Sequence, residues 1–249
     1  MIGSVERYSS SIRRRRVNLL GMRSVRVVLI AFALYLVVSH FIVATFRVES
    51  VSMEPAVNPG DRLIVSLLDF GPRVPFSRAR FPGLGRPERG DIVIVEPPFF
   101  EDEPVFLRLL DPVASFFTFQ RATLRRDLYG ARVNSYMLKR IVGMPGDTVR
   151  LASYSLWIKP RGGSDFVSED QLLPPGFRAR TALSASGWSS SLPFSGNSAE
   201  RILSDGEYFV LGDNRPDSSD SRSWGTLSKD RIVAKVIYRY WPLRSLGKP

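Results

Sequence analysis

The amino-acid sequence predicts a mainly β protein, in which an N-terminal transmembrane helix precedes an antiparallel β-sheet body with a small inserted β lobe. Three observations predict this fold class. Residues 27–46 carry no charge, and at about 1.5 Å per residue they form a helix of roughly 30 Å, the thickness of a bilayer core. The 19 Gly and 18 Pro are scattered along the chain, which favours short strands and turns. Residues 160–204 are rich in Ser, Gly and Pro and have weak periodicity, which indicates an insertion.

Changes in composition place the boundaries of four segments. They are a basic cytoplasmic segment over residues 1–26, the anchor over residues 27–46, a main β domain over residues 47–151 and 205–249, and the inserted lobe over residues 152–204. The uncharged run exceeds the roughly 7–15 residues of a signal peptide's apolar core. Residues 43–46 offer no small-x-small cleavage site, so we expect an uncleaved anchor. Met22 opens a compact basic lead-in to the helix and is an alternative start to Met1.

The positive charge is concentrated before the anchor. The net charge is +11, and residues 1–26 hold seven Arg and one Glu, a local balance of +6. By the positive-inside rule, this excess predicts a cytoplasmic N-terminus and a body on the other side of the membrane. Contact between the Arg-rich segment and anionic lipid fits that placement. The rest of the chain carries only the remaining +5, so we do not expect binding to nucleic acid.

Short apolar runs bounded by turns predict the strands of the body. We expect strands at residues 61–65, 92–95, 139–142, 148–151, 155–158, 208–211 and 232–241, with a hairpin over residues 148–158. In the last strand, alternate residues from Ile232 to Tyr240 share one face, and Lys235 and Arg239 point the other way. An aromatic-rich segment over residues 106–119 either covers the core or contacts the membrane, and its composition favours the core.

The residue types that are missing restrict the chemistry of the body. The chain has no Cys, which excludes disulfides, cysteine nucleophiles and thiolate metal sites. Its one His, His40, lies within the predicted anchor. A nucleophilic Ser in the body would therefore need a different base. A lysine can serve if burial lowers its pKa enough to keep the amine neutral.

Ser52 and Lys139 best fit these requirements. Ser52 follows the predicted anchor by six residues, and Pro55 and Pro59 stiffen its loop. Lys139 lies on a short apolar strand without an adjacent carboxylate, whereas the other four lysines lie in polar contexts. The competing interpretations are a serine that forms a turn and a lysine that protects a strand edge.

A cluster rich in Asp, Asn and Ser occupies residues 212–222. Its composition suits a calcium loop, but its spacing does not match an EF-hand, and Arg215 and Arg222 would repel a cation. We therefore expect a loop held by Asp–Arg pairs and by hydrogen bonds from side chains to the backbone. We expect neither a metal nor an organic cofactor.

Four short motifs occur in order along the chain. They are Ser52-Met53-Glu54-Pro55, Arg89-Gly90-Asp91-Ile92-Val93, Lys139-Arg140-Ile141-Val142-Gly143-Met144-Pro145-Gly146-Asp147, and Gly212-Asp213-Asn214-Arg215 to Ser221-Arg222. Together, after an anchor, they resemble the conserved boxes of bacterial type I signal peptidases (leader peptidases). The resemblance covers most of residues 27–241. Ala56-Val57 and Pro216 depart from the family's usual residues, and the stretch between Ser52 and Lys139 is long, which indicates an insertion within residues 97–134.

The resemblance implies a serine endopeptidase of the bacterial plasma membrane, with its catalytic domain outside the cytoplasm. Ser52 would be the nucleophile and Lys139 the general base. The other implied roles are orientation of the lysine amine by Ser218, an oxyanion hole formed by the Ser52 backbone N–H and the Ser50 hydroxyl, structural support by Asp213, Asp220 and Arg222, and shaping of the substrate pocket by Met53 and Ile141.

The implied substrates are secretory preproteins, bound as an added strand and cut after a small-x-small motif. Two alternatives remain open. One is a peptidase with the same chemistry and a single client in a conjugation or pilus system. The other is a membrane-anchored β adaptor of a secretion system without enzymatic activity, in which Lys139 would be protonated and distant from Ser52.

Overall fold

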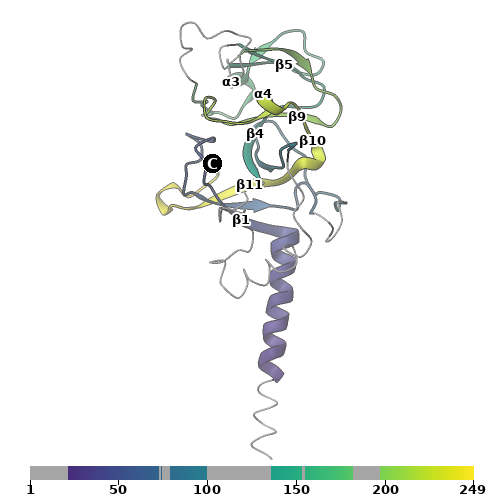
Figure 1. The fold of residues 1–249 in the computed structure, drawn as a ribbon, viewed down its shortest axis with the longest axis vertical. Coiled ribbons are helices and arrows are strands. Elements are labelled where there is room, and N and C mark those ends of the chain that lie inside the picture. The colour runs from purple at the N-terminus through teal and green to yellow at the C-terminus, as the bar shows by residue number, and fades with distance from the viewer. Residues whose placement is uncertain (1–21, 73, 75–78, 100–135, 153–154, 182–196) are drawn as a thin grey trace, which may run out of the picture.

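The structure is a computed structural model, and it describes residues 22–72, 74, 79–99, 136–152, 155–181 and 197–249. A long helix leads into a β body that contains two sheets (Figure 1). After the helix over residues 22–37, the elements are η1 (Val38–Ile42), β1 (Val43–Arg47), β2 (Arg62–Ser66), β3 (Ile92–Val95), β4 (Met137–Gly143), β5 (Thr148–Ala152), β6 (Ser155–Lys159), β7 (Val167–Ser168), α3 (Glu169–Leu172), β8 (Ser198–Ile202), β9 (Glu207–Leu211), α4 (Ser221–Trp224), β10 (Leu227–Ser228), η2 (Lys229–Arg231), β11 (Ile232–Trp241) and η3 (Leu243–Ser245).

The larger sheet has seven strands in the order β1-β2-β11-β3-β4-β9-β10. All its neighbouring strands are antiparallel, which confirms the predicted mainly β, antiparallel body. The strands predicted at residues 92–95 and 232–241 have the predicted bounds, and those near residues 61–65, 139–142 and 208–211 differ by one or two residues at one or both ends. The aromatic-rich segment over residues 106–119 lies outside the described residues, as do residues 100–135 as a whole.

The smaller sheet forms the lobe and has the order β7-β6-β5-β8. Strands β5 and β6 form the predicted antiparallel hairpin. Because β5 belongs to this sheet, the lobe begins at Thr148, four residues before the predicted boundary at residue 152. Strand β8 was not predicted, since all five of its residues are exposed and it has no alternation of apolar and polar side chains.

Alternating side chains of the central strands fill separate parts of the core. On β3, Ile92 and Ile94 pack with the side chains of β2 and β11, whereas Val93 and Val95 join a second cluster with residues of β9. On β9, Val210 joins this second cluster and Leu211 packs against the lobe. The central strands are therefore buried on both faces, which explains their unbroken apolar runs.

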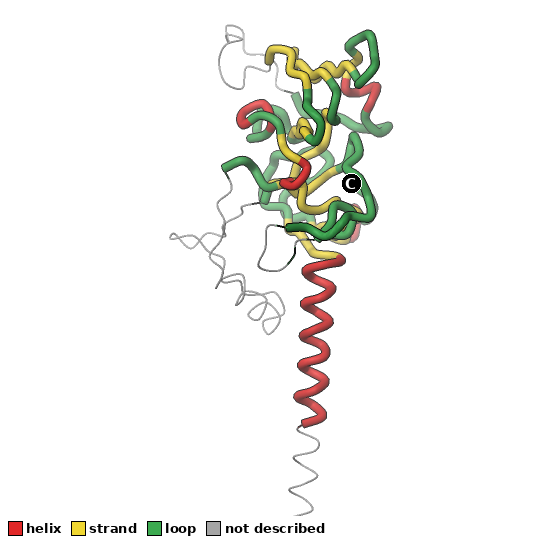
Figure 2. The backbone as a smooth tube through the Cα atoms, turned by 90° about the vertical axis from the view of Figure 1, so that its right-hand side faces the viewer, coloured by secondary structure: helices red, strands yellow, loops and turns green. Residues whose placement is uncertain are grey.

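The N-terminal helix extends away from the body (Figure 2). Across the part of the chain that the structure describes, no helix is both long and apolar enough to cross a membrane. The prediction that the helix continues to residue 46 is wrong, because the helical segment ends at Ile42. Residues Val43–Arg47 instead form β1 and pair with β2, which satisfies their backbone groups in the sheet.

Strand β11 departs from the predicted alternation halfway along its length. Ile232, Ala234 and Val236 are buried as predicted, but Tyr238 is exposed. The register against β2 shifts between Val236 and Tyr238. A β-bulge at this point turns the following side chains away from the core, which the sequence pattern does not reveal.

Candidate active site

The loop between β1 and β2 places Ser52 at the edge of the core. A tight turn joins the Glu54 backbone N–H to the Val51 carbonyl at 3.1 Å, and the Val57 N–H to the Met53 carbonyl at 3.0 Å. The side chains of Met53 and Val57 are buried in the main core and fix the loop from below. Ser52 itself is buried. Its hydroxyl is therefore held on a turn with little freedom to move.

Lys139 reaches this hydroxyl from the middle of β4. Its Nζ donates a hydrogen bond to Ser52 Oγ at 3.2 Å, and its side chain is buried. Burial lowers the pKa of Lys139 from 10.5 to about 8. The negative charges of Asp220 and Asp213 oppose this decrease, and the positive charge of Arg222 adds to it. Both Asp residues approach from a distant part of the chain, so the residues next to Lys139 in the sequence include no carboxylate.

Asp220 and Arg222 form an ion pair behind the lysine. Arg222 Nε lies 2.8 Å from Asp220 Oδ1, and Arg222 Nη2 lies 2.9 Å from Asp220 Oδ2. Asp220 also caps the short helix α4 and accepts the backbone N–H of Gly212 at 3.0 Å. Burial alone would raise the pKa of Asp220, but the contacts with Arg222 and Gly212 outweigh it and hold the pKa below its usual value. Asp220 therefore stays ionised beside Lys139.

Asp213 is paired with Arg140, the residue after the lysine. Arg140 Nε and Nη2 donate to the two Asp213 carboxylate oxygens at 2.9 and 2.7 Å. Arg140 Nη1 also donates to the Gly90 carbonyl at 2.8 Å. Because both acidic side chains are held by arginines, the cluster has the predicted Asp–Arg character rather than that of a calcium loop. Among the described residues, no group of acidic or His side chains could hold a metal ion.

Ser50 is hydrogen-bonded to Ser52, whereas Ser218 packs against Gly212 beside the Ser52 carbonyl. Ser50 Oγ accepts the Ser52 backbone N–H at 3.1 Å, so the two predicted oxyanion donors are side by side. Ser218 is buried, and a Cβ atom at Gly212 would lie 2.2 Å from Ser218 Oγ and 2.5 Å from the Ser52 carbonyl oxygen. Glycine at position 212 therefore permits the close approach. The described contacts include no hydrogen bond from Ser218 to the lysine amine, so its orienting role stays a prediction.

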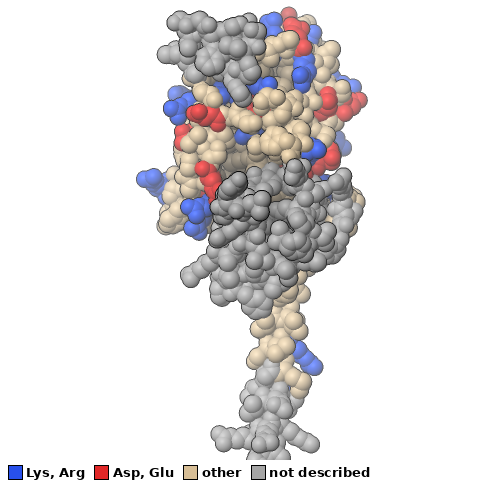
Figure 3. Space-filling model, viewed as in Figure 1, with Lys and Arg blue, Asp and Glu red and all other residues tan. Residues whose placement is uncertain are grey.

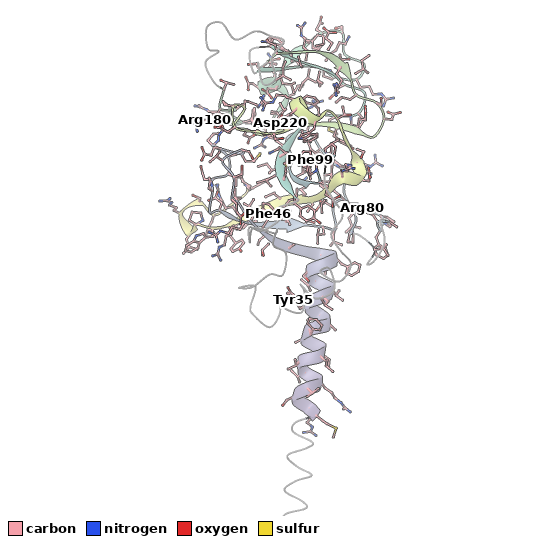
Figure 4. The ribbon with its side chains drawn as sticks, in the orientation of Figure 1. Tyr35, Phe46, Arg80, Phe99, Arg180 and Asp220 are labelled. Atoms are coloured by element: carbon pink, nitrogen blue, oxygen red, sulfur yellow. The ribbon has the colours of Figure 1, made fainter. Side chains whose placement is uncertain are left out.

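A pocket with a volume of about 240 Å³ contains both Ser52 and Lys139. Its lining residues come from the end of β1 and the loop after it, from the start of β4 and the residue before it, and from the loop before α4. They are Phe46, Arg47, Val48, Glu49, Ser50, Ser52, Met53, Tyr136, Met137, Leu138, Lys139, Asp217 and Ser219. Met53 lines this pocket, and its role in shaping a substrate pocket stays a prediction. Ile141 does not line the pocket, because it is fully buried in the second core cluster. Phe46 lies where the helix meets the body (Figure 4), so the pocket is on the side of the body that faces the helix.

Three buried residues near the site were missed or undervalued by the sequence analysis. Arg140 binds Asp213, and Arg215 binds Glu169 of α3, with Nη2 and Oε2 2.7 Å apart. Asn214 donates its backbone N–H to the Ser52 carbonyl at 3.0 Å and its side-chain Nδ2 to the Val51 carbonyl at 3.1 Å. Arg140, Asn214 and Arg215 lie within the motifs quoted above, and that position was the available signal. Nothing in the sequence marks Glu169.

Comparison with known proteins identifies a family for this chain. The family model described as "Signal peptidase, peptidase S26" matches residues 21–241. A signal peptidase IB of Staphylococcus aureus is 24% identical over 213 residues, which cover 86% of this chain and 85% of the relative. A signal peptidase I of Bacillus licheniformis is 26% identical over 226 residues, which cover 90% of each chain.

Among solved structures, a crystal structure of a signal peptidase I from Enterococcus faecalis aligns with a TM-score of 0.32 and 21% identity. The alignment covers 62% of this chain and 99% of that one. The family match spans both predicted catalytic residues and both sheets. The chain therefore belongs to the signal peptidase family, peptidase S26, and is a peptidase.

Proposed function

We propose that this protein is a membrane-anchored Ser–Lys endopeptidase that removes N-terminal signal peptides from secretory preproteins after small-x-small sites. The observation that carries the proposal is the 3.2 Å contact between Lys139 Nζ and Ser52 Oγ at the pocket of this peptidase fold. A Ser–Lys pair is a known variant of the Ser-His-Asp arrangement. The contact also argues against the adaptor alternative, which requires the two side chains to be apart.

In the first step, Ser52 Oγ attacks the carbonyl carbon of the scissile peptide bond, and its proton passes to the neutral Lys139 Nζ. The carbonyl oxygen becomes an oxyanion, which the Ser50 hydroxyl and the Ser52 backbone N–H stabilise by hydrogen bonds once this N–H leaves Ser50 Oγ. When the C–N bond breaks, the lysine ammonium gives its proton to the leaving amine. An acyl ester on Ser52 remains, and the new N-terminus of the mature protein departs.

In the second step, Lys139 takes a proton from a water molecule that attacks the ester. The proton then returns to Ser52 Oγ as the signal peptide's carboxylate is released. At pH 7 a lysine with a pKa of about 8 is neutral in about one molecule in ten. That fraction is sufficient for a general base, whereas a lysine at 10.5 would be neutral in fewer than about one in a thousand.

The residues that line the pocket favour substrates with short side chains next to the scissile bond. Val48, Met53 and Leu138 are buried and line it beside the nucleophile. Bulky substrate side chains would have to displace core residues that are already tightly packed. Discrimination between Ala and a larger residue would then arise from steric exclusion rather than from specific polar contacts.

The surface of the N-terminal helix supports a membrane anchor. Val27, Leu29, Ile30 and Leu34 are 60–69% exposed on this helix, and stretches of exposed apolar side chains are stable in lipid rather than in water. In the face shown in Figure 3 the described helix is mostly tan, with basic side chains only near its far end. This charge pattern fits a cytoplasmic N-terminus and a body outside the cytoplasm at the bacterial inner membrane.

Cleavage of a purified preprotein by the full chain tests the proposal. Wild type, Ser52→Ala and Lys139→Ala are compared in liposomes, and the N-terminus of the product is sequenced. We expect the wild type alone to cut, after a small-x-small site. Near-normal cleavage by either variant would refute the assignment of the two residues. Activity on several unrelated preproteins would separate a general enzyme from a peptidase with a single client.

A further inference from the structure

We propose that Glu169 of the lobe is a positioning residue for the general base: through its buried ion pair with Arg215, it holds the loop over residues 212–222 in place beside Lys139. The inference rests on the proposed function for the identity of the base. It concerns a residue that belongs to no motif and comes from the inserted lobe rather than from the main sheet.

The ion pair is fully enclosed. Glu169 Oε2 lies 2.7 Å from Arg215 Nη2, and the two side chains are 4% and 0% exposed. The other carboxylate oxygen, Oε1, accepts the Leu156 backbone N–H at 3.3 Å. Glu169 thus joins strand β6 of the lobe to the loop. A buried pair of this kind is strongly coupled to its surroundings, because removal of one partner leaves the other charge in a region of low polarity.

Arg215 connects this pair to the ion pair behind the lysine. Its Nε donates to the Gly212 carbonyl at 3.0 Å, and the Gly212 N–H donates to Asp220 Oδ2. Its own carbonyl accepts Arg222 Nη2 at 2.7 Å. Arg222 Nη2 also reaches the Ser218 carbonyl at 3.2 Å. Hydrogen bonds within residues 212–222 therefore hold the loop together, and the Glu169–Arg215 ion pair connects the loop to the lobe.

The charged groups that act on Lys139 all depend on this loop. Asp220 and Arg222 belong to it, and Asp213, which holds Arg140 of β4, is its second residue. Ser52 Oγ completes the surroundings of the amine. Glu169 touches neither Lys139 nor the substrate pocket. Its effect on the base is therefore indirect, through the position of Asp220 and Arg222.

A second connection between the lobe and the loop does not depend on Glu169. The Arg180 N–H donates to the Asp213 carbonyl at 2.7 Å, and the Arg215 N–H donates to the Arg180 carbonyl at 2.9 Å. Arg180 Nη1 also pairs with Glu54, next to the nucleophile's turn, at 3.0 Å. Figure 4 shows Arg180 beside the segment that carries Asp220. These backbone contacts do not involve the Glu169 charge, so Glu169→Gln should weaken the alignment of the loop rather than detach it.

The experiment compares Glu169→Gln with Asp170→Asn in the full chain. Asp170 is the next residue of α3, is exposed and serves as the matched control. We expect Glu169→Gln to lower kcat for preprotein cleavage by about tenfold or more with little change in KM. Loss of this negative charge makes the loop more positive, which disfavours the lysine ammonium. The pKa of Lys139 should therefore fall, and the limb on which the rate rises with pH should move to lower pH, whereas the loss in kcat should persist on the plateau above it.

Two further measurements separate positioning from general destabilisation. The chain has only five lysines, so NMR titration of labelled lysine side chains reports the Lys139 pKa without any cleavage. The double variant Glu169→Gln/Arg215→Gln removes both charges and should restore the Lys139 pKa toward that of the wild type. Thermal unfolding of each variant shows whether the fold is retained.

An unchanged Lys139 titration in Glu169→Gln would overturn the inference, as would wild-type activity in that variant. A double variant that also regained the wild-type kcat would overturn it, since the loss of rate would then come from the charge and not from the position of the loop. Failure of the proposed function has a different signature, because wild type would then cut no preprotein while the NMR titration would still respond to Glu169.

Discussion

The loop over residues 212–222 and the outer surface of the lobe both contain pairs of acidic and arginine side chains, in very different surroundings. Around the site, the side chains of Arg140 and Asp213 are 8% and 1% exposed. On the lobe, the side chains of Arg150 and Glu200 are 44% and 55% exposed, with Nη1 and Oε1 3.5 Å apart. Water and ions screen the lobe pair, whereas the site pair lies in the protein interior. The same chemical contact therefore fixes geometry in one region and contributes little in the other.

The difference has a consequence for Lys139. A neutral lysine needs an apolar environment, but a buried site that also needs rigid loops must hold several charges nearby. The structure resolves this by pairing each nearby acid with its own arginine, Asp213 with Arg140 and Asp220 with Arg222. None of the described contacts pairs the lysine with a carboxylate. Its pKa stays low because of burial despite the adjacent acids.

The largest expected effect on stability comes from the site pair. Asp213→Asn removes the negative charge but keeps the shape, and leaves buried Arg140 without its carboxylate. We expect the free energy of unfolding to fall by about 3–5 kcal/mol, as for other buried pairs that lose one partner. Denaturant unfolding of the body measures it. A loss below about 1 kcal/mol would show that the site pair behaves like a surface pair.

A second effect on the free energy of unfolding, an increase, is expected when Lys139 is replaced. The pKa of Lys139 is about 8 in the folded chain and 10.5 when unfolded. Below pH 8 both states bind the proton, and the burial of the charge costs about 3 kcal/mol. Between pH 8 and 10.5 the unfolded state binds more protons, so stability rises with pH through this window.

Lys139→Met should therefore be inactive yet more stable than wild type by up to about 3 kcal/mol at pH 7, with the gain disappearing above about pH 10.5. Unfolding measured at several pH values tests this. A variant less stable than wild type at pH 7 would mean that the contact with Ser52 outweighs the desolvation of the amine.

The smallest effect should come from the lobe. Glu200→Gln removes the charge of the exposed pair and keeps the side-chain volume. We expect a change in the free energy of unfolding below about 0.5 kcal/mol, and none in cleavage. This variant is the amide-for-acid match to Asp213→Asn. Equal losses in the two variants would remove the contrast between the regions.

Much of the site could be predicted from the sequence because its chemistry leaves few candidates. The absence of Cys and the position of the single His leave a lysine as base, and Lys139 lies on an apolar strand. The Asp220–Arg222 pair is also local, since its partners are two residues apart and meet at the start of α4. Local spacing and residue type were sufficient in these cases.

Contacts between distant segments were not predictable in this way. Arg140 and Asp213 meet because β4 and β9 are neighbours in the sheet, and Glu169 meets Arg215 because the lobe folds back on the loop. The bulge in β11 and the change from helix to strand after Ile42 depend on pairing with β2, which the apolar pattern alone does not specify. In each case a tertiary contact decided between structures that the local sequence allows.

The most direct test of the account is the pH dependence of kcat/KM for preprotein cleavage by the full chain. A lysine base with a pKa of about 8 predicts that kcat/KM rises tenfold per pH unit below pH 8 and levels off above it. A profile that is flat between pH 6 and 9, or whose limb lies near pH 10.5, would contradict a buried, neutral Lys139 as the base for Ser52.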